Sequence, residues 1–187
     1  MRIRFAIAAG VLTAVLALGM TAQDNMENVP MVGGAAMYPS KDIIQNAMNS
    51  KDHTTLVAAV KAAGLVDTLE GSGPFTVFAP TNAAFDKLPA GTVDTLLKPE
   101  NQDQLKKVLT YHVVAGRITA HKLAAMIKKG DGKAELKTVE GGTLTAMMDG
   151  TNIVLKDEKG GTATVTQADV MQKNGVIHVI DSVLMPS

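Results

Sequence analysis

The segment NGVIHVIDSV, residues 174–183, places His178, Asp181 and Ser182 inside an apolar run. These are the residue types of hydrolytic triads, in which a histidine takes a proton from a hydroxyl group. In a strand, however, His178 and Asp181 point to opposite faces. Ser182 shares the face of His178 but lies about 13 Å further along the strand, beyond hydrogen-bond reach. The spacing therefore favours a structural histidine, bonded to backbone or hydroxyl groups, over a catalytic one.

The remaining candidates for a catalytic or metal centre are incomplete. The chain contains four histidines: His53, His112, His121 and His178. None stands in the His-x-His or HExxH spacing typical of metal sites. Met147 and Met148 are possible soft ligands, but they point to opposite faces of a predicted strand. Because the chain has no cysteine, thiolate ligands, cysteine nucleophiles and disulfides are excluded. We therefore expect no enzyme site, no metal and no cofactor.

Tyr111 and His112 follow a predicted amphipathic helix over residues 100–109. If the helix continues, His112 extends its apolar face; if a strand begins, the two side chains point to opposite faces. In either case we expect one of the two side chains to be buried with a hydrogen-bond partner. The alternative is a recognition site, in which Tyr111 serves as an amphipathic anchor.

Residues 1–22 have the pattern of a secretory signal peptide. Arg2 and Arg4 precede an apolar stretch at 5–18, and small residues follow, so cleavage is expected after Gly19 or after Ala22. The apolar stretch is short for a membrane span, which needs about 20 residues. Loss of the two arginines leaves 16 basic and 18 acidic residues, and aromatic residues are only 3% of the chain. We therefore expect a secreted or periplasmic protein with no nucleic-acid partner and no stable membrane insertion after signal cleavage.

Residues 23–40 carry two prolines and a Gly-Gly pair without sustained periodicity, which predicts a flexible linker before a domain at 41–187. The first half of that domain predicts helices, with Ser40, Thr81 and Thr119 as N-caps. The helices are expected at 41–48, 54–63, 82–88, 92–97, 100–109 and 119–129.

From residue 133 the apolar period changes from 3.6 to 2, which predicts strands. The strands are expected at 133–139, 143–148, 151–156, 162–171 and 176–185, with earlier ones at 75–79 and 111–114. Asp149-Gly150 is a strong signal for a two-residue hairpin turn. The pattern predicts an α+β domain, in which helices flank a twisted sheet or small sandwich.

Three segments resemble, in order and spacing, the conserved segments of the fasciclin domain family. They are GPFTVFAPTNAAFDKLP at 73–89, LTYHVV at 109–114 and NGVIHVIDSVLMP at 174–186. The resemblance covers residues 41–187 and implies a wedge-like β-sandwich of about seven strands, with helices packed along one edge. It also implies an extracellular, non-enzymatic protein that mediates cell adhesion or matrix contact.

The resemblance further implicates two pairs of residues in partner binding. In animal matrix relatives, an Asp-Ile pair just before the last conserved segment, and the Tyr-His segment, are implicated in integrin binding. The matching positions here are Asp169, Val170, Tyr111 and His112, with valine where isoleucine is usual. An exposed Asp169 could bind a partner's metal ion or arginine while Val170 buries apolar area. The alternative is that Asp169 caps a turn by accepting hydrogen bonds from nearby N–H groups.

The function hypothesis is a secreted or periplasmic adhesion module. Its partner would be a cell-surface or matrix protein or a polysaccharide, bound without catalysis. The alternative is a small-molecule or polysaccharide-binding protein of the cell envelope, which would use a cleft lined by Met and Val between helices and sheet.

Overall fold

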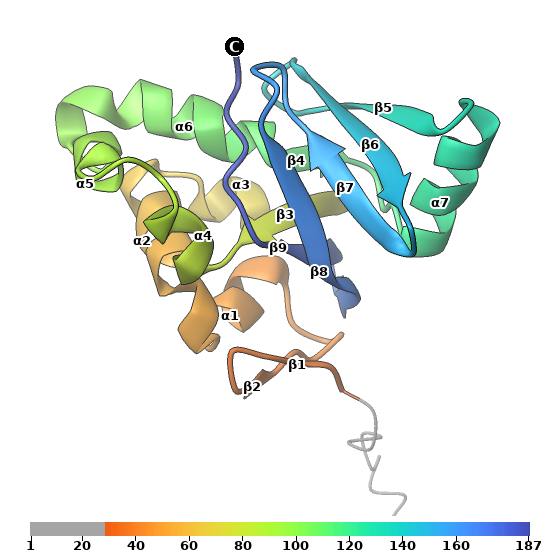
Figure 1. The fold of residues 1–187 in the computed structure, drawn as a ribbon. Helices are drawn as coiled ribbons and strands as arrows, with labels where there is room; N and C mark the ends of the chain where they lie inside the picture. Colours follow the sequence, from red (N-terminus) through yellow and green to blue (C-terminus); the bar gives the residue numbers. More distant parts are fainter. Residues whose placement is uncertain (1–28) are drawn as a thin grey trace, which may run out of the picture.

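The computed structural model describes residues 29–187, so the predicted signal peptide at 1–22 and its cleavage positions lie outside the described residues. Seven strands form one mixed sheet in the order β4-β3-β9-β8-β7-β6-β5 (Figure 1). Their bounds are β3 Phe75–Pro80, β4 Val113–Ala115, β5 Lys133–Lys137, β6 Thr143–Asp149, β7 Asn152–Lys156, β8 Thr162–Gln172 and β9 Gly175–Ile180. β3 and β9 pair in parallel, and the other neighbours in the sheet pair antiparallel.

The sheet curls until its two edge strands nearly meet. Val114 of β4 forms an isolated bridge with Thr138, which follows β5. The N–H of Val139 donates to the carbonyl of Val113 at 2.8 Å. β8 contributes to the curvature, because its register to β9 shifts between Val165 and Val170 and such bulges bend a strand. The result is an almost closed barrel with few free backbone edges.

The described chain also contains seven α-helices and two short 3-10 helices, Lys51–His53 and Pro99–Asn101. The α-helices are α1 Ile43–Ala47, α2 Thr54–Ala62, α3 Val66–Glu70, α4 Asn82–Asp86, α5 Thr92–Leu96, α6 Gln102–Tyr111 and α7 Ala120–Lys129. Thr81 and Thr119 cap α4 and α7 through their side chains, as predicted. The first helix is capped by Asp42 and not by Ser40, because α1 begins later than predicted and Asp42 Oδ1 accepts the Gln45 N–H at 2.8 Å.

The helices divide the apolar interior into two clusters. Helices α1 to α6 gather on one side of the strands, and α7 packs against β5 and β6 on the other (Figure 1). The helix-side core, between the first group and the sheet, includes Ile44, Leu56, Val60, Val77 and Ile177. The barrel core, between the curled sheet and α7, includes Phe78, Leu123, Leu144, Leu155 and Ile180. Every residue of β9 is buried, because the strand faces both cores.

A short N-terminal hairpin packs onto the domain. It consists of β1 (Met31–Val32) and β2 (Ala35–Ala36), joined by Gly33 and Gly34 at φ values of +57° and +75°. Val32 and the adjacent Met37 are buried in the helix-side core. These residues fall within the stretch expected to be a flexible linker, and over 29–40 the structure differs from that expectation. The sequence pattern lacked a period here because few side chains of this segment reach the core: Val32 and Met37 are buried in it, and Ala35 packs against it partly buried.

The predicted α+β class, the seven strands and the flanking helices are confirmed. A two-residue hairpin turn joins β6 to β7 as predicted, but its loop is Gly150-Thr151, one residue later than expected, because Asp149 still pairs with Asn152 in the sheet. Within residues 29–187, no helix combines the length and the apolar character that a membrane crossing requires.

Candidate functional site

Tyr111, the last residue of α6, lies in the barrel core with no exposed surface. Its hydroxyl group donates to the carbonyl of Thr143 at 2.9 Å and accepts the N–H of Glu158 at 3.2 Å. Burial raises the pKa of Tyr111 to about 12, and nearby carboxylates act in the same direction. The phenol therefore joins α6 to two loops of the sheet and stays neutral.

His112, the C-cap residue that follows α6, is also buried. Its Nδ1 lies 2.8 Å from the carbonyl of Val108, and its Nε2 accepts the N–H of Leu184 at 3.0 Å. These partners place the single proton of the neutral ring on Nδ1. Burial lowers the pKa of His112 to about 4. The imidazole therefore ties α6 to the C-terminal segment.

His178 uses both ring nitrogens within the fold. Its Nε2 donates to the carbonyl of Ile118 at 2.8 Å, and its Nδ1 accepts the N–H of Asp169 at 3.3 Å. The ring stacks on Phe78 with a centroid separation of 5.6 Å, and burial lowers its pKa. Ser182 instead bonds to Asp181 at 3.2 Å and accepts from Lys87 at 3.3 Å. His178 is thus bonded to backbone groups, as predicted, and no Ser–His pair forms.

Asp169 occupies the bulge of β8, at a φ of +56°. Aspartate and asparagine adopt this left-handed conformation more readily than most other residues with a side chain. Oδ1 accepts the N–H of Ala120, the first residue of α7, at 2.7 Å. A carboxylate at this position also complements the positive end of the helix dipole. Asp169 therefore bonds to the first turn of a helix 49 residues away in sequence, and among the described residues no N–H of its own turn donates to it, so the predicted capping of that turn is wrong.

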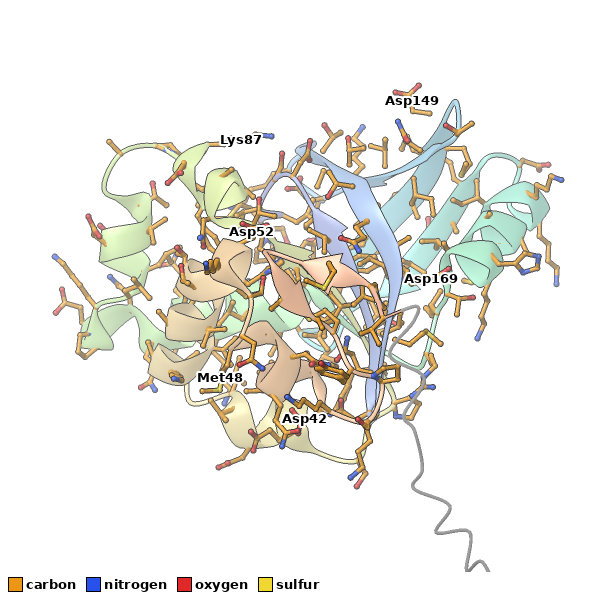
Figure 2. The ribbon with its side chains drawn as sticks, turned by 90° about the horizontal axis from the view of Figure 1, so that it is seen from below. Asp42, Met48, Asp52, Lys87, Asp149 and Asp169 are labelled. Atoms are coloured by element: carbon orange, nitrogen blue, oxygen red, sulfur yellow. The ribbon has the colours of Figure 1, made fainter. Side chains whose placement is uncertain are left out.

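The structure separates the four predicted partner-binding residues into one exposed side chain and three buried ones. Asp169 is exposed, between β8 and α7 (Figure 2). Its neighbour Val170 is fully buried in the helix-side core, and Tyr111 and His112 are buried as described above. The partner-binding role of these residues stays a prediction. Of the four residues, only Asp169 presents its side chain to the surface, so only Asp169 can contact a partner directly without a change in the fold.

Two features escaped the sequence interpretation. The first is a buried amide network, in which Asn46 Nδ2 donates to Gln172 Oε1 and Asn174 Oδ1 accepts the Ile43 N–H at 3.1 Å. Asn174 Nδ2 also donates to the carbonyl of Leu69 at 2.6 Å. This network fastens α1 and α3 to the turn between β8 and β9. The Asn174-Gly175 pair predicts a turn, but nothing local indicates that the asparagine is buried.

The second feature is His53, which sequence reasoning left without a role. Its side chain is only 3% exposed, although it immediately precedes α2. Nδ1 lies 2.9 Å from the hydroxyl group of Ser50, whereas Nε2 is buried and has no hydrogen-bond partner within the described residues. Burial lowers the pKa of His53, and this outweighs the opposing effects of the Ala79 carbonyl and Asp52. The Ala79 carbonyl nevertheless makes no hydrogen bond of ordinary length and angle with Nε2.

Within residues 29–187, no group of three or more His, Asp or Glu side chains is arranged to hold a metal ion.

Comparisons of the chain with known proteins all indicate the same family. A family model described as Fasciclin domain matches residues 51–186. The chain is 46% identical to protein sll1483 of Synechocystis sp. over 169 residues, which cover 90% of this chain and 87% of that protein. It is 34% identical over 170 residues to the cell surface glycolipoprotein MPB83 of Mycobacterium bovis, with 88% of this chain and 70% of the relative covered.

The fold also has a solved counterpart, a FAS1 domain pair from the insect cell adhesion molecule fasciclin I. It matches with a TM-score of 0.69 at 20% sequence identity, over 79% of this chain and 51% of that chain. The extent of the family match and the identity to full-length relatives agree with the three conserved segments in the sequence. The chain therefore belongs to the Fasciclin domain family.

Proposed function

We propose that the protein is a secreted or periplasmic adhesion module, which binds a cell-surface or matrix protein or a polysaccharide without catalysis. Membership of the Fasciclin domain family is the observation that carries this proposal. A relative named as a cell surface glycolipoprotein supports a location outside the cytoplasm, as does the signal peptide predicted at residues 1–22.

The use of the buried polar groups supports a non-enzymatic role. His112 and His178 have both ring nitrogens bonded within the fold, and the phenol of Tyr111 is bonded twice. Groups held in this way have no free position from which to transfer a proton to a substrate. Recognition is then a property of the exterior surface.

Within that surface, the exposed edge at Asp169 is the proposed contact. One carboxylate oxygen is fixed by the Ala120 N–H, and Oδ2 accepts no hydrogen bond from the described residues. The carboxylate is thus held in one orientation with an oxygen free for a partner's arginine, lysine or bound cation. Val170 beneath it anchors the bulge through the helix-side core and keeps the position of the carboxylate constant.

The experiment measures binding of the full chain, after signal removal, to intact cells and separately to immobilised envelope protein and polysaccharide fractions. Asp169→Asn keeps an acceptor oxygen for Ala120 and suits the left-handed backbone, but it removes the charge. We expect it to weaken binding about tenfold or more, because a charged hydrogen bond is lost. The melting temperature should fall by no more than about 3 °C, the effect of the lost charge at the start of α7. Asp169→Ala should weaken binding similarly and also lower stability by about 1 kcal/mol, because the hydrogen bond from the Ala120 N–H is lost while Thr119 remains the N-cap of α7.

Asp131→Asn is the matched control. Asp131 is the other exposed aspartate with a left-handed backbone, at a φ of +52°, and it lies beyond the opposite end of α7. Its substitution should change neither binding nor stability. Unchanged binding of a folded Asp169→Asn variant would show that the contact is elsewhere. Failure of the wild-type protein to bind any fraction above the level of a denatured sample would contradict the adhesion role itself.

A further inference from the structure

Three basic residues from distant parts of the chain converge at the end of the sheet where β8 turns into β9. They are Lys41 before α1, Arg117 after β4 and Lys173 in the turn itself. The Lys173 N–H donates to the carbonyl of Lys41 at 2.9 Å, and Nη2 of Arg117 donates to the carbonyl of Lys173 at 3.2 Å. Figure 2 marks this region with Asp42, which follows Lys41 in the sequence. The fold therefore gathers three positive charges on one part of the surface.

The fold holds these charges in place without neutralising them. Arg117 and Lys173 are exposed, and Lys41 is partly buried. Within residues 29–187, none of the three forms an ion pair with a carboxylate. Nη2 of Arg117 also donates to the Gln172 carbonyl at 3.1 Å, and the other N–H groups of this guanidinium have no partner in the described chain. A guanidinium that is fixed on one side and free on the other is suited to an anionic group of a partner.

Two aromatic rings border the same surface. Lys41 Nζ lies 5.1 Å from the centre of the Tyr38 ring, and this cation–π contact positions the ammonium group. Phe75 is the first residue of β3, and its N–H donates to the carbonyl of Asn174, within the turn, at 3.0 Å. Among residues 29–187, Tyr38 and Phe75 are the only Tyr and Phe side chains that are not buried. Partly exposed rings of this kind can pack against the C–H groups of another molecule.

Acidic residues near the turn reduce the positive charge but do not remove it. Asp42 directs Oδ1 to the Gln45 N–H at 2.8 Å, and Glu70 is exposed at the end of α3. Asp169 lies four residues before Lys173, about 13 Å away along an extended strand, which exceeds the screening length of roughly 10 Å at 0.1 M salt. A single small anion would therefore be held weakly. A polymer that repeats its anionic group can contact several of the cations at once and so bind more tightly.

The combination of rings and separated cations favours an acidic polysaccharide over other polyanions. Sugar rings present C–H faces that fit beside Tyr38 and Phe75, and carboxylates on those sugars can reach the cations. Without the two arginines at 1–22, the chain carries 16 basic and 18 acidic residues. The whole molecule therefore does not attract the dense phosphate charge of a nucleic acid.

We propose that this sheet-end surface, formed by Tyr38, Lys41, Phe75, Arg117 and Lys173, binds a polysaccharide that carries carboxylate groups on its sugar rings. The inference rests on the proposed adhesion role and gives its polysaccharide partner a chemical class. The surface is separate from the contact at Asp169, whose carboxylate would select positive groups.

The test measures binding of the full chain, after signal removal, to polygalacturonate by titration calorimetry at neutral pH. The methyl ester of this polymer has the same sugar backbone without the charges, and poly-L-glutamate has carboxylates without sugar rings. We expect polygalacturonate to bind about tenfold more tightly than either, because each comparison polymer loses one of the two kinds of contact. Added salt should weaken the binding of polygalacturonate.

Replacement of the cations distinguishes a defined site from diffuse attraction. Single substitutions to Gln at Lys41, Arg117 and Lys173 should each weaken binding about threefold, and the triple variant about 30-fold. Lys173→Gln removes a side chain that makes no hydrogen bond in the described chain, so its effect reports on the partner and not on the fold. The matched control makes the same change at three exposed lysines beyond the start of α7, namely Lys128, Lys129 and Lys133. It removes the same total charge and should leave binding unchanged.

Several outcomes would overturn the proposal. Polygalacturonate might fail to bind the wild-type protein, its methyl ester or poly-L-glutamate could bind equally well, or the control variant could weaken binding as much as the triple variant does. If the chain binds cells or envelope fractions but not polygalacturonate, this inference fails and the adhesion role stands. Asp169→Asn should not weaken polygalacturonate binding, and a tenfold loss would contradict two separate surfaces.

Discussion

The two cores of this molecule each enclose a histidine, and they treat it differently. His178 faces the barrel core with 0% exposure, and each ring nitrogen has a backbone partner. His53 adjoins the helix-side core with 3% exposure, and one ring nitrogen has none in the described chain. Because burial is nearly equal, the difference lies in the partners. A satisfied polar group fixes one arrangement of its neighbours, whereas an unsatisfied one does not.

The packing around the two histidines follows the same division. Phe78 stacks on His178, and the barrel core is filled by side chains from all seven strands of the sheet and from α6 and α7. The space beside His53 is instead bounded by short helices and the N-terminal hairpin, which leave a cavity between them. Short helices present few side chains per element, so a complete fit is harder to reach than with paired strands. The barrel core is therefore expected to hold the fold together, and the helix-side core to adapt.

Acid should affect both regions and produces the largest expected change. The pKa values of His53, His112 and His178 are all lowered by burial, that of His112 to about 4 from an ordinary 6.5. The unfolded chain therefore binds more protons below pH 6.5, and the stability present above that pH is lost as the pH falls towards 4. For His112 alone the loss amounts to about 3 kcal/mol, of which about 2 kcal/mol falls above pH 5.

Urea unfolding at pH 7, 6 and 5 measures this loss in a range where few carboxylates titrate. His112→Gln should flatten the dependence, although it lowers stability at neutral pH. Substitution of the exposed His121 by Gln should leave the slope as it is in wild type. A free energy of unfolding that stays constant from pH 7 to 5 would mean that the buried histidines are not protected from protons in solution.

Leucine substitutions distinguish the two histidines directly. His178→Leu leaves the Ile118 carbonyl and the Asp169 N–H without their side-chain partners, so we expect a loss of about 3 kcal/mol. His53→Leu deprives only Ser50 of a partner and removes a polar atom that had none, so the change should stay within about 1 kcal/mol. Urea unfolding at pH 7.5, where all three buried histidines are neutral, gives both values. Equal losses would remove the distinction between the two cores.

Local rules were enough to predict much of this fold. Thr81 and Thr119 cap helices because their side chains reach backbone N–H groups three residues on. The existence of a hairpin turn within one residue of Asp149-Gly150 and the structural character of His178 follow from strand geometry within a few residues. These features depend on neighbours in sequence, and a single chain displays them directly.

The features that define the candidate sites depend instead on distant partners. Asp169 bonds to α7 only because a bulge in β8 turns its carboxylate towards Ala120. The role of His53 depends on how α2 packs against β3, and the hairpin at 31–36 appeared to be a linker because its burial depends on the helix-side core. The sequence records no local sign of such contacts, since an unfilled space is a property of the assembled elements.

Adding one methylene group to a valine in each core gives the smallest expected effect and the closest comparison of their packing. Val60 lines the cavity, so Val60→Ile should stabilise the protein by about 1 kcal/mol as the new methyl group enters free space. Val114 is 3% exposed in the barrel core, where the same substitution should destabilise by about 1 kcal/mol or more, because the added group displaces packed neighbours. Thermal unfolding of the two variants beside wild type measures the sign of each change. Opposite signs would support an adaptable core beside a filled one, whereas destabilisation by both substitutions would mean that the cavity is too narrow to accept even a methyl group.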